Sequence, residues 1–226
     1  MPAQVSVHSI DLAIDRRAAE AQLMQLSGPE RERARRFAHD RDRHRYVAAH
    51  AGLRRILGEW LKEPPADVRL QAEIHHKPTL LDHPEVHFNL SHGDDVGLVA
   101  ISTHGPVGVD VERLRSLPDM AAVADSVFCA AERAAWRSVP EALSVRAFFN
   151  GWTRKEALIK ATGEGFRANL QALCVSLLPD EQPRVLAAPP SVEAPWQLQQ
   201  LEPQPGYVGA VAMRCAVPFE VRVHAD

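Results

Sequence analysis

The sequence predicts an α+β fold built from two similar halves, because one order of elements occurs twice along its 226 residues. In each half, a strand leads into short helices, one long helix and then three strands. The junction falls near residues 103–106, where Gly105-Pro106 favours a turn. We therefore divide the chain into residues 1–104 and 105–226.

The first half contains the clearest local signals. Its expected elements are a strand at 5–11, helices at 18–26, 29–37 and 40–61, and strands at 68–74, 86–91 and 96–102. Asp40 is a suitable N-cap for the long helix, which must stop before Pro64-Pro65. The turn Gly93-Asp94-Asp95 joins the last two strands as a hairpin.

The second half repeats the order, and its long helix carries an unusual charge. Its expected elements are a strand at 107–112, helices at 120–127, 130–138 and 142–161, and strands at 172–178, 196–202 and 207–217. An apolar stripe at i, i+4, i+7 and i+14 of the long helix consists of Val145, Phe149, Trp152 and Ile159. Glu156 occupies position i+11 of that stripe, where a carboxylate is costly unless it is paired or binds a cation. An i,i+4 pair with Lys160 at the edge of the stripe is the simpler explanation.

Composition favours an ordinary globular protein. Hydrophobic residues make up 46% and charged residues 24% of the chain, and no apolar run reaches the length of a membrane span. The start of the chain lacks a signal-peptide pattern, and three widely spaced cysteines, Cys129, Cys174 and Cys215, suit a reducing cytoplasm better than a disulfide framework. Without Cys-x-x-Cys pairs, a zinc-thiolate site is not expected.

Arginines crowd into the segment from residue 31 to residue 55. They are Arg31, Arg33, Arg35, Arg36, Arg41, Arg43, Arg45, Arg54 and Arg55. Acidic residues are interleaved with them and the net charge is −3, which argues against nucleic acid as the partner. A solvated helix face and a local site for a small anion both remain open.

Two strand segments carry groups suited to a metal and to phosphate. Asp110 and Glu112 lie two residues apart, so both project from one face of a strand, where Mg²⁺ would relieve their repulsion. A half-exposed strand with its polar face in water gives the same pattern. Ser91 and His92 end a strand before a turn and offer donors to phosphate oxygens, although an ordinary hairpin end would also look like this.

The ordered set of motifs resembles the surfactin-type 4′-phosphopantetheinyl transferases. The set is Asn89-x-Ser91-His92, Gly108-x-Asp110-x-Glu112 and Trp152-x-x-Lys155-Glu156-Ala157-x-x-Lys160. Arg-Arg-Phe37 followed by Asp42 and Arg45, and His76-Lys77-Pro78, add to the resemblance, which spans roughly residues 25–170. The family fold is a pseudo-duplicated pair of α+β halves with the active site between them.

The resemblance implies coenzyme A as donor, Mg²⁺ as cofactor and a serine of an apo acyl or peptidyl carrier protein as acceptor. It implies three metal ligands, Asp110, Glu112 and Glu156. The implied coenzyme A contacts are Arg45, Lys77, Pro78, Ser91, His92, Lys155 and Lys160. Among them, Lys77 and Pro78 would lie beside the adenine, and Arg45 near the 3′-phosphate, with Arg31, Arg33 and Arg41 as other candidates. A monomeric cytoplasmic enzyme is expected.

The implied chemistry assigns Glu156 as metal ligand and general base, and Lys160 as the cation that neutralises the departing 3′,5′-ADP. The carrier is expected to contact Arg113, Arg115 or Arg133. Two alternatives remain: another Mg²⁺-dependent phosphodiesterase-like enzyme, and a non-catalytic protein that binds coenzyme A or carriers.

Overall fold

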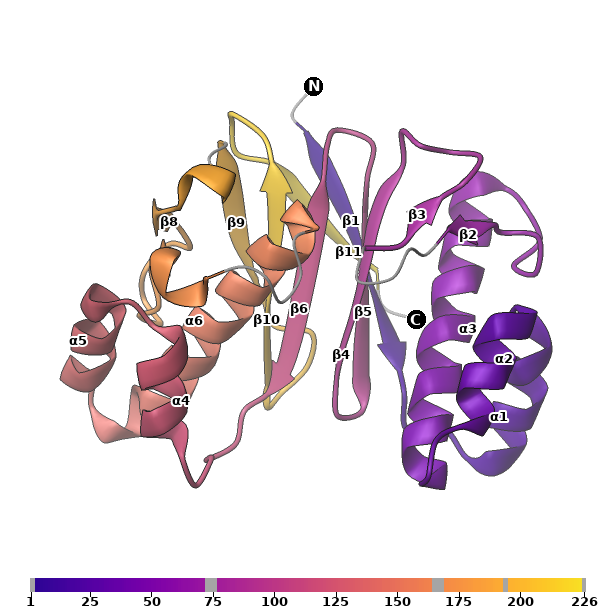
Figure 1. Ribbon diagram of the computed structural model, residues 1–226, viewed down its shortest axis with the longest axis horizontal. Coiled ribbons are helices and arrows are strands. Elements are labelled where there is room, and N and C mark those ends of the chain that lie inside the picture. Colours follow the sequence, from indigo (N-terminus) through magenta and orange to yellow (C-terminus); the bar gives the residue numbers. More distant parts are fainter. Residues whose placement is uncertain (1–2, 72–76, 164–168, 193–194, 225–226) are drawn as a thin grey trace.

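Helices flank two central sheets on opposite sides in the computed structural model (Figure 1). The structure describes residues 3–71, 77–163, 169–192 and 195–224. Its mixture of helices and sheets confirms the α+β class. No helix of the described residues combines the length and the apolar character needed to cross a bilayer.

The elements follow the chain in an order close to the predicted one. Those up to residue 102 are β1 (Gln4–Asp11), α1 (Arg16–Gln22), η1 (Leu23–Gln25), α2 (Gly28–Arg35), α3 (Asp40–Leu61), β2 (Leu70–Gln71), β3 (Thr79–Leu80), β4 (His87–Gly93) and β5 (Val96–Ser102). The remainder are β6 (Val107–Arg113), α4 (Met120–Val127), α5 (Ala130–Ser138), α6 (Glu141–Thr162), η3 (Leu170–Ala172), β7 (Cys174–Val175), β8 (Val185–Ala187), η4 (Pro190–Val192), β9 (Trp196–Leu201), β10 (Tyr207–Arg214) and β11 (Glu220–His224).

Two main sheets meet along their β4 and β6 edges. The first has the strand order β11-β1-β5-β4 and the second β6-β10-β9. β4 and β6 lie side by side (Figure 1), and the backbone N–H of Val109 donates to the side-chain oxygen of Asn89 across the junction at 2.9 Å. The short pairs β2-β3 and β7-β8 lie outside these sheets. Residues from both sheets therefore border the junction.

Each main sheet is covered by one long helix. α3 packs Leu53, Ile56 and Leu57 against the first sheet, and α6 packs Leu158 against the second. α6 ends at Thr162, one residue beyond the predicted end, and its C-cap Gly163 has a φ of 79°, the left-handed conformation that glycine adopts readily. Each long helix therefore lies against a sheet whose edge strand, β4 or β6, borders the junction.

Several boundaries differ from the sequence prediction. Helices α4 and α5 have the predicted bounds, but the strand expected at 172–178 is reduced to β7, after the short helix η3. The strand expected at 68–74 is described only at Leu70–Gln71, because residues 72–76 lie outside the described ranges. β11 was not predicted; it pairs in parallel with β1, from Gln4 opposite Glu220 to His8 opposite His224.

Candidate active site

Two carboxylates on β6 and one on α6, all singled out by the sequence, lie where the strand faces the helix. Asp110 and Glu112 project from one face of β6, while Val109 and Val111 fill the core on the other. Burial raises the pKa of Glu156 on α6, and the negative charge of Asp110 raises it further. Glu156 is thus close enough to Asp110 for their charges to interact.

Gly108 allows α6 to approach the strand that carries two of these carboxylates. A Cβ at residue 108 would lie 2.1 Å from the carbonyl oxygen of Ala157 and 2.4 Å from the backbone nitrogen of Ala161, both on α6. Real Cβ atoms do not come so close to backbone, so a side chain here would push the helix away. The glycine of the motif therefore sets the distance between Glu156 and β6.

Asp110 uses its two oxygens differently. Its Oδ1 accepts hydrogen bonds from the Ser91 hydroxyl at 2.8 Å and from the Lys160 ammonium at 2.6 Å. The Lys160 ammonium also donates to the Ser91 hydroxyl at 2.8 Å. The other oxygen, Oδ2, is buried and has no hydrogen-bond partner among the described residues. A buried carboxylate oxygen without a donor suits a cation ligand.

Glu112 lies in an environment that disfavours its charge. Burial raises its pKa to about 7, and the charge of Asp110 acts in the same direction. Arg115, Lys160 and the indole N–H of Trp152 oppose this shift without cancelling it. Asp110 thus disfavours the charges of both Glu112 and Glu156, and carboxylates in such a setting suit a hard divalent cation such as Mg²⁺.

Cations gather at the end of β4, beside the carboxylates. Partial burial lowers the pKa of His92, and the positive charges of Lys160, His50 and Arg45 lower it further. Because His92 is exposed while Ser91 is buried, the two side chains face opposite ways, as strand alternation predicted. The site thus combines a negative centre with a positive border.

Arg45 is held by the hairpin turn between β4 and β5. Its Nε and Nη2 lie 3.0 and 2.7 Å from Oδ1 of Asp95, and Nη2 lies 3.4 Å from Oδ1 of Asp94. Of the other candidates for the 3′-phosphate, Arg41 alone reaches the same turn, with Nη2 3.7 Å from Asp95.

The two remaining arginine candidates have partners in the helical layer. Arg31 donates to the carbonyl oxygen of Leu26 at 2.8 Å. The Arg33 guanidinium lies over the Tyr46 ring, 5.5 Å from its centroid. Neither contact brings the arginine to the carboxylates.

Lys77 and Pro78 line a cavity of about 480 Å³ at the junction of the sheets. Thr162 and Gly163, at the end of α6, form part of the same lining. Burial lowers the pKa of Lys77 to about 8, and its ammonium donates to the carbonyl oxygen of Val107. The cavity therefore lies less than one helical turn beyond Lys160, and adenine contact remains a prediction.

Lys155 lies elsewhere than the sequence led us to expect. Its side chain is 1% exposed, and its ammonium lies 2.6 Å from Oε2 of Glu132 and donates to the carbonyl oxygens of Val127 and Leu170 at 2.8 Å. All of these partners lie on the side of α6 that faces α5 and β7, away from Asp110. In this structure Lys155 anchors α6 and does not face a phosphate site.

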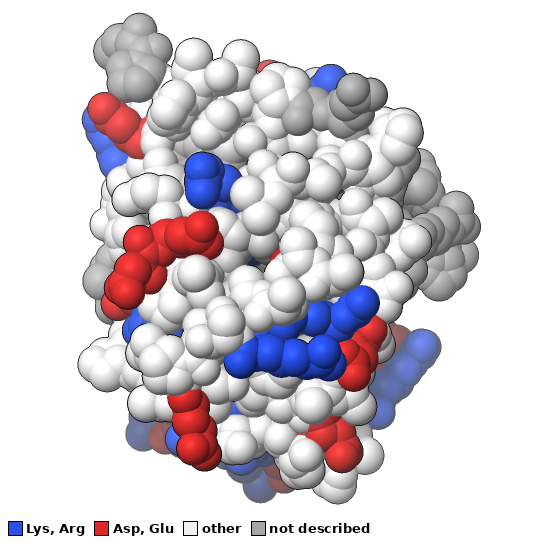
Figure 2. Space-filling view, turned by 90° about the vertical axis from the view of Figure 1, so that its left-hand side faces the viewer, with Lys and Arg blue, Asp and Glu red and all other residues white. Residues whose placement is uncertain are grey.

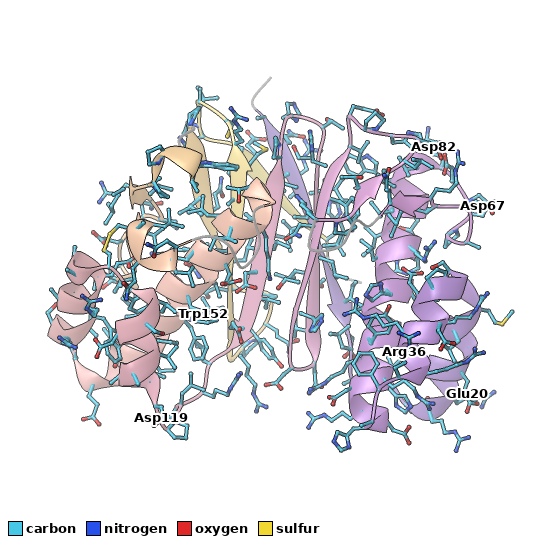
Figure 3. All side chains as sticks on the ribbon, viewed as in Figure 1. Glu20, Arg36, Asp67, Asp82, Asp119 and Trp152 are labelled. Atoms are coloured by element: carbon cyan, nitrogen blue, oxygen red, sulfur yellow. A yellow bond between two sulfur atoms is a disulfide. The ribbon has the colours of Figure 1, made fainter. Side chains whose placement is uncertain are left out.

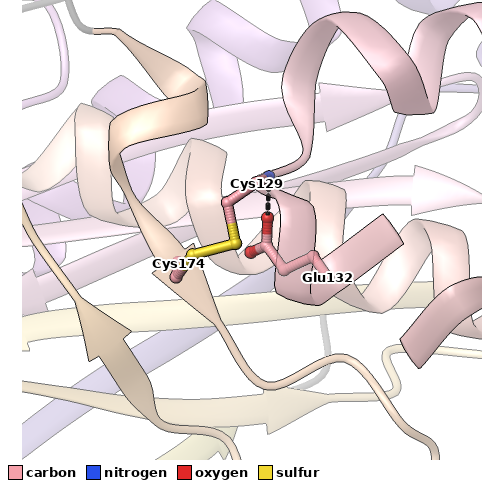
Figure 4. Close-up of side chains that lie close together, drawn as sticks. All are labelled: Cys129, Glu132 and Cys174. Atoms are coloured by element: carbon pink, nitrogen blue, oxygen red, sulfur yellow. Dashed lines mark hydrogen bonds between the residues drawn. A yellow bond between two sulfur atoms is a disulfide. The ribbon is translucent and has the colours of Figure 1, made fainter. Parts of the chain in front are cut away.

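A disulfide lies beside this buried ion pair (Figure 4). It joins Cys129, before α5, to Cys174 in β7, and only Cys215 is free. The backbone N–H groups of Cys129 and Val175 both donate to the Glu132 carboxylate at 2.7 Å. The bond was not anticipated, and it weakens the inference of a reducing compartment from cysteine spacing.

Sequence reasoning assigned no role to two residues that contact predicted site residues, Glu132 beside Lys155 and Trp152 beside Glu112. Glu132 follows Cys129 by three residues, the spacing of a capping box, and this signal could have marked it. Trp152, labelled on α6 in Figure 3, belongs to the predicted apolar stripe and to the motif and was assigned no role in the site, yet its indole N–H acts on Glu112. No local pattern predicts a contact between residues so far apart in sequence.

Arg113 and Arg115 border the acidic site, whereas Arg133 does not. Arg113 and Arg115 each lie 3.8 Å from Oδ2 of Asp94, and Arg115 also lies 3.8 Å from Oε2 of Glu112. The guanidinium of Arg133 donates to the carbonyl oxygen of Phe128 at 2.6 Å.

Two family models match the chain. The one described as 4′-phosphopantetheinyl transferase superfamily matches residues 106–212, which include Asp110, Glu112 and Glu156. The one described as 4′-phosphopantetheinyl transferase, N-terminal, matches residues 15–104.

Curated relatives resemble the chain over most of its length. The 4′-phosphopantetheinyl transferase HetI of a Nostoc species is 36% identical over 83% of this chain and 78% of its own. The transferase psf-1 of Bacillus pumilus is 32% identical over 89% and 86%, and Sfp of Bacillus subtilis is 28% identical over 82% and 81%. The chain belongs to the 4′-phosphopantetheinyl transferase family, in its surfactin-type branch.

Proposed function

We propose that this enzyme transfers the 4′-phosphopantetheine group of coenzyme A to a serine of an apo carrier protein. The observation that carries the proposal is the acidic site, in which one buried oxygen of Asp110 has no donor among the residues that the structure describes, with Glu112 and Glu156 nearby. The carrier is an acyl or peptidyl carrier protein.

Asp110, Glu112 and Glu156 would hold Mg²⁺, with Oδ2 of Asp110 as the ligand left free by Ser91 and Lys160. When bound, the ion would neutralise charge on the pyrophosphate of coenzyme A. Support for this set comes from its all-oxygen composition and from the charge of Asp110, which raises the pKa of both Glu112 and Glu156.

The reaction joins the serine oxygen to the phosphorus of the transferred group and breaks the bond from that phosphorus to 3′,5′-ADP. Glu156 accepts the proton of the serine hydroxyl, a role favoured by a pKa raised through burial and through Asp110. Lys160 neutralises the departing phosphate, since its ammonium already lies among the acidic groups.

Coenzyme A would lie across the positive border and the cavity. His92 and Arg45 would face its 3′-phosphate, Ser91 its pyrophosphate, and Lys77 with Pro78 its adenine. The electrostatic interaction between Arg45 and His92 and the cavity beside Lys77 support this path. Lys155 is left out, because its ammonium is buried against Glu132.

The enzyme is proposed to be a cytoplasmic monomer of two pseudo-duplicated halves, 1–104 and 105–226, with the site between them. The carrier would dock near Arg113 and Arg115, which are about half exposed next to Glu112. The proposal includes no nucleic acid partner, because the net charge is −3 and the arginines are interleaved with acidic residues. On the face of the second half, described Lys and Arg side chains lie beside Asp and Glu rather than in one basic stripe (Figure 2).

The test is to incubate the protein with coenzyme A, Mg²⁺ and a panel of apo carriers, and to weigh each carrier. A carrier heavier by one phosphopantetheine supports the proposal. Release of phosphopantetheine without loading would indicate a phosphodiesterase instead. Binding of coenzyme A without either product would indicate a non-catalytic binding protein.

A further inference from the structure

The β4–β5 turn carries two adjacent carboxylates, and one of them is rigidly built into the fold. The backbone carbonyl of Asp95 accepts the N–H of Leu12 at 2.8 Å, and its own N–H donates to the Tyr207 hydroxyl at 3.4 Å. Leu12 follows β1, whereas Tyr207 begins β10 in the other sheet. The backbone of Asp95 is therefore fixed from both sides of the junction.

The Asp95 carboxylate binds one edge of the Arg45 guanidinium. Nε and Nη2 both donate to the same oxygen, Oδ1, at 3.0 and 2.7 Å. None of the described contacts of Arg45 uses Nη1. The Arg45 side chain is 17% exposed, so few orientations remain open to it. A planar guanidinium held by one edge presents its remaining N–H groups in a fixed direction.

We propose that Asp95 is a positioning residue for donor recognition: it fixes Arg45 so that the free Nη1 meets the 3′-phosphate of coenzyme A. This inference rests on the proposed function, in which Arg45 contacts that phosphate. Asp95 itself touches no substrate. Its effect comes from ordering Arg45 before the donor arrives, which removes an entropic cost from binding.

A purely electrostatic role for Asp95 predicts the opposite sign. A negative charge beside an anion site repels the anion, so its removal would tighten binding of coenzyme A. Fixing Arg45 predicts weaker binding when the carboxylate is removed. The sign of the change in affinity therefore separates the two roles.

The experiment measures the dissociation constants of coenzyme A and dephospho-coenzyme A by calorimetry, with Mg²⁺ and without carrier. We expect Asp95→Asn to weaken coenzyme A binding about tenfold and to leave dephospho-coenzyme A within about twofold. Asp40→Asn is the matched control, because it changes the net charge by the same amount. Asp40 is exposed and pairs with Arg43, on the same helix as Arg45. Unchanged or tighter binding of coenzyme A by Asp95→Asn would overturn the proposal, as would equal losses for both donors.

Variants of Arg45 separate this inference from the proposed function. If Arg45→Ala binds both donors with the wild-type preference, the 3′-phosphate assignment fails and the positioning role fails with it. If Arg45→Ala loses the preference while Asp95→Asn keeps it, only the positioning role fails. In the Arg45→Ala background, Asp95→Asn should change nothing further.

A second variant tests the proposal even if the Asp95→Asn protein does not fold. Arg45→Lys keeps the charge but lacks the planar edge that Asp95 holds, so it should also lose the preference for coenzyme A. Retention of the full preference by Arg45→Lys would contradict the role of Asp95. Thermal melting of each variant verifies that the protein is folded.

Discussion

Replacing Glu112 by Gln tests whether the acidic site destabilises the metal-free protein. The pKa of Glu112 is about 7 in the folded protein against an ordinary 4.5, because burial and Asp110 disfavour its charge. The folded state therefore binds this proton more tightly than the unfolded state. The resulting stability is fully present below pH 4.5 and is lost as the pH rises through about 7.

The size of the effect follows from the two pKa values. Each pKa unit corresponds to about 1.36 kcal/mol. The difference between the two pKa values therefore limits the contribution of Glu112 to the free energy of unfolding to about 3 kcal/mol. In EDTA at pH 8, Glu112→Gln should be more stable than the wild type by up to that amount. At pH 5 the free energies of unfolding of the wild type and Glu112→Gln should nearly coincide, since the amide resembles the protonated carboxyl.

The assay is urea unfolding between pH 5 and 8.5, followed by tryptophan fluorescence, with and without Mg²⁺. Mg²⁺ should stabilise the wild type at pH 8 more than Glu112→Gln, because a ligand that binds only the folded state stabilises by mass action. Glu59→Gln is the control, since Glu59 is exposed on α3. Parallel pH-stability curves for the wild type and Glu112→Gln in EDTA would refute the reasoning.

Three further predictions concern catalysis, the buried ion pair and the carrier. Glu156→Gln should lower the turnover of carrier loading by about 10²–10⁴-fold, the usual range for a lost general base. Near-normal loading would contradict the role of Glu156 as the base. Glu132→Gln should lower the free energy of urea unfolding by about 3–5 kcal/mol, because Lys155 would be left buried without its counter-ion; a loss below about 1 kcal/mol would contradict this. The KM for the carrier should rise between low and physiological salt, since Arg113 and Arg115 are exposed and screening acts over about 8–10 Å; a KM independent of salt would indicate an apolar interface.

Sequence patterns predicted most of the helices and the strand that carries Asp110 and Glu112, two of the proposed metal ligands. The apolar stripe of α6 and its terminal Gly163 are local features, so periodicity and capping chemistry suffice to find them. Alternation in β6 likewise placed Asp110 and Glu112 on one face. The interaction of Asp110 with Glu156 could not be predicted in this way, since no local rule brings β6 against α6.

The failures share one physical cause, which is contact across long stretches of sequence. Lys155 and Lys160 both follow Trp152 on α6, and the motif gave no reason to separate them. Lys160 meets Asp110, whereas Lys155 is turned toward Glu132, because residues five positions apart on a helix point about 140° apart. The disulfide and β11 also join distant segments, so spacing alone could not predict them.

The parallel pairing of β11 with β1 has a consequence for how the chain folds during synthesis. Gln4 and Glu220, opposite each other in these strands, are 216 positions apart. The outer edge of β1 therefore stays open on the ribosome until the whole second sheet has been made, and an open edge invites pairing with other chains. A fragment ending at residue 104 would keep that edge permanently, so independent expression of the halves should be attempted with β11 supplied to the first.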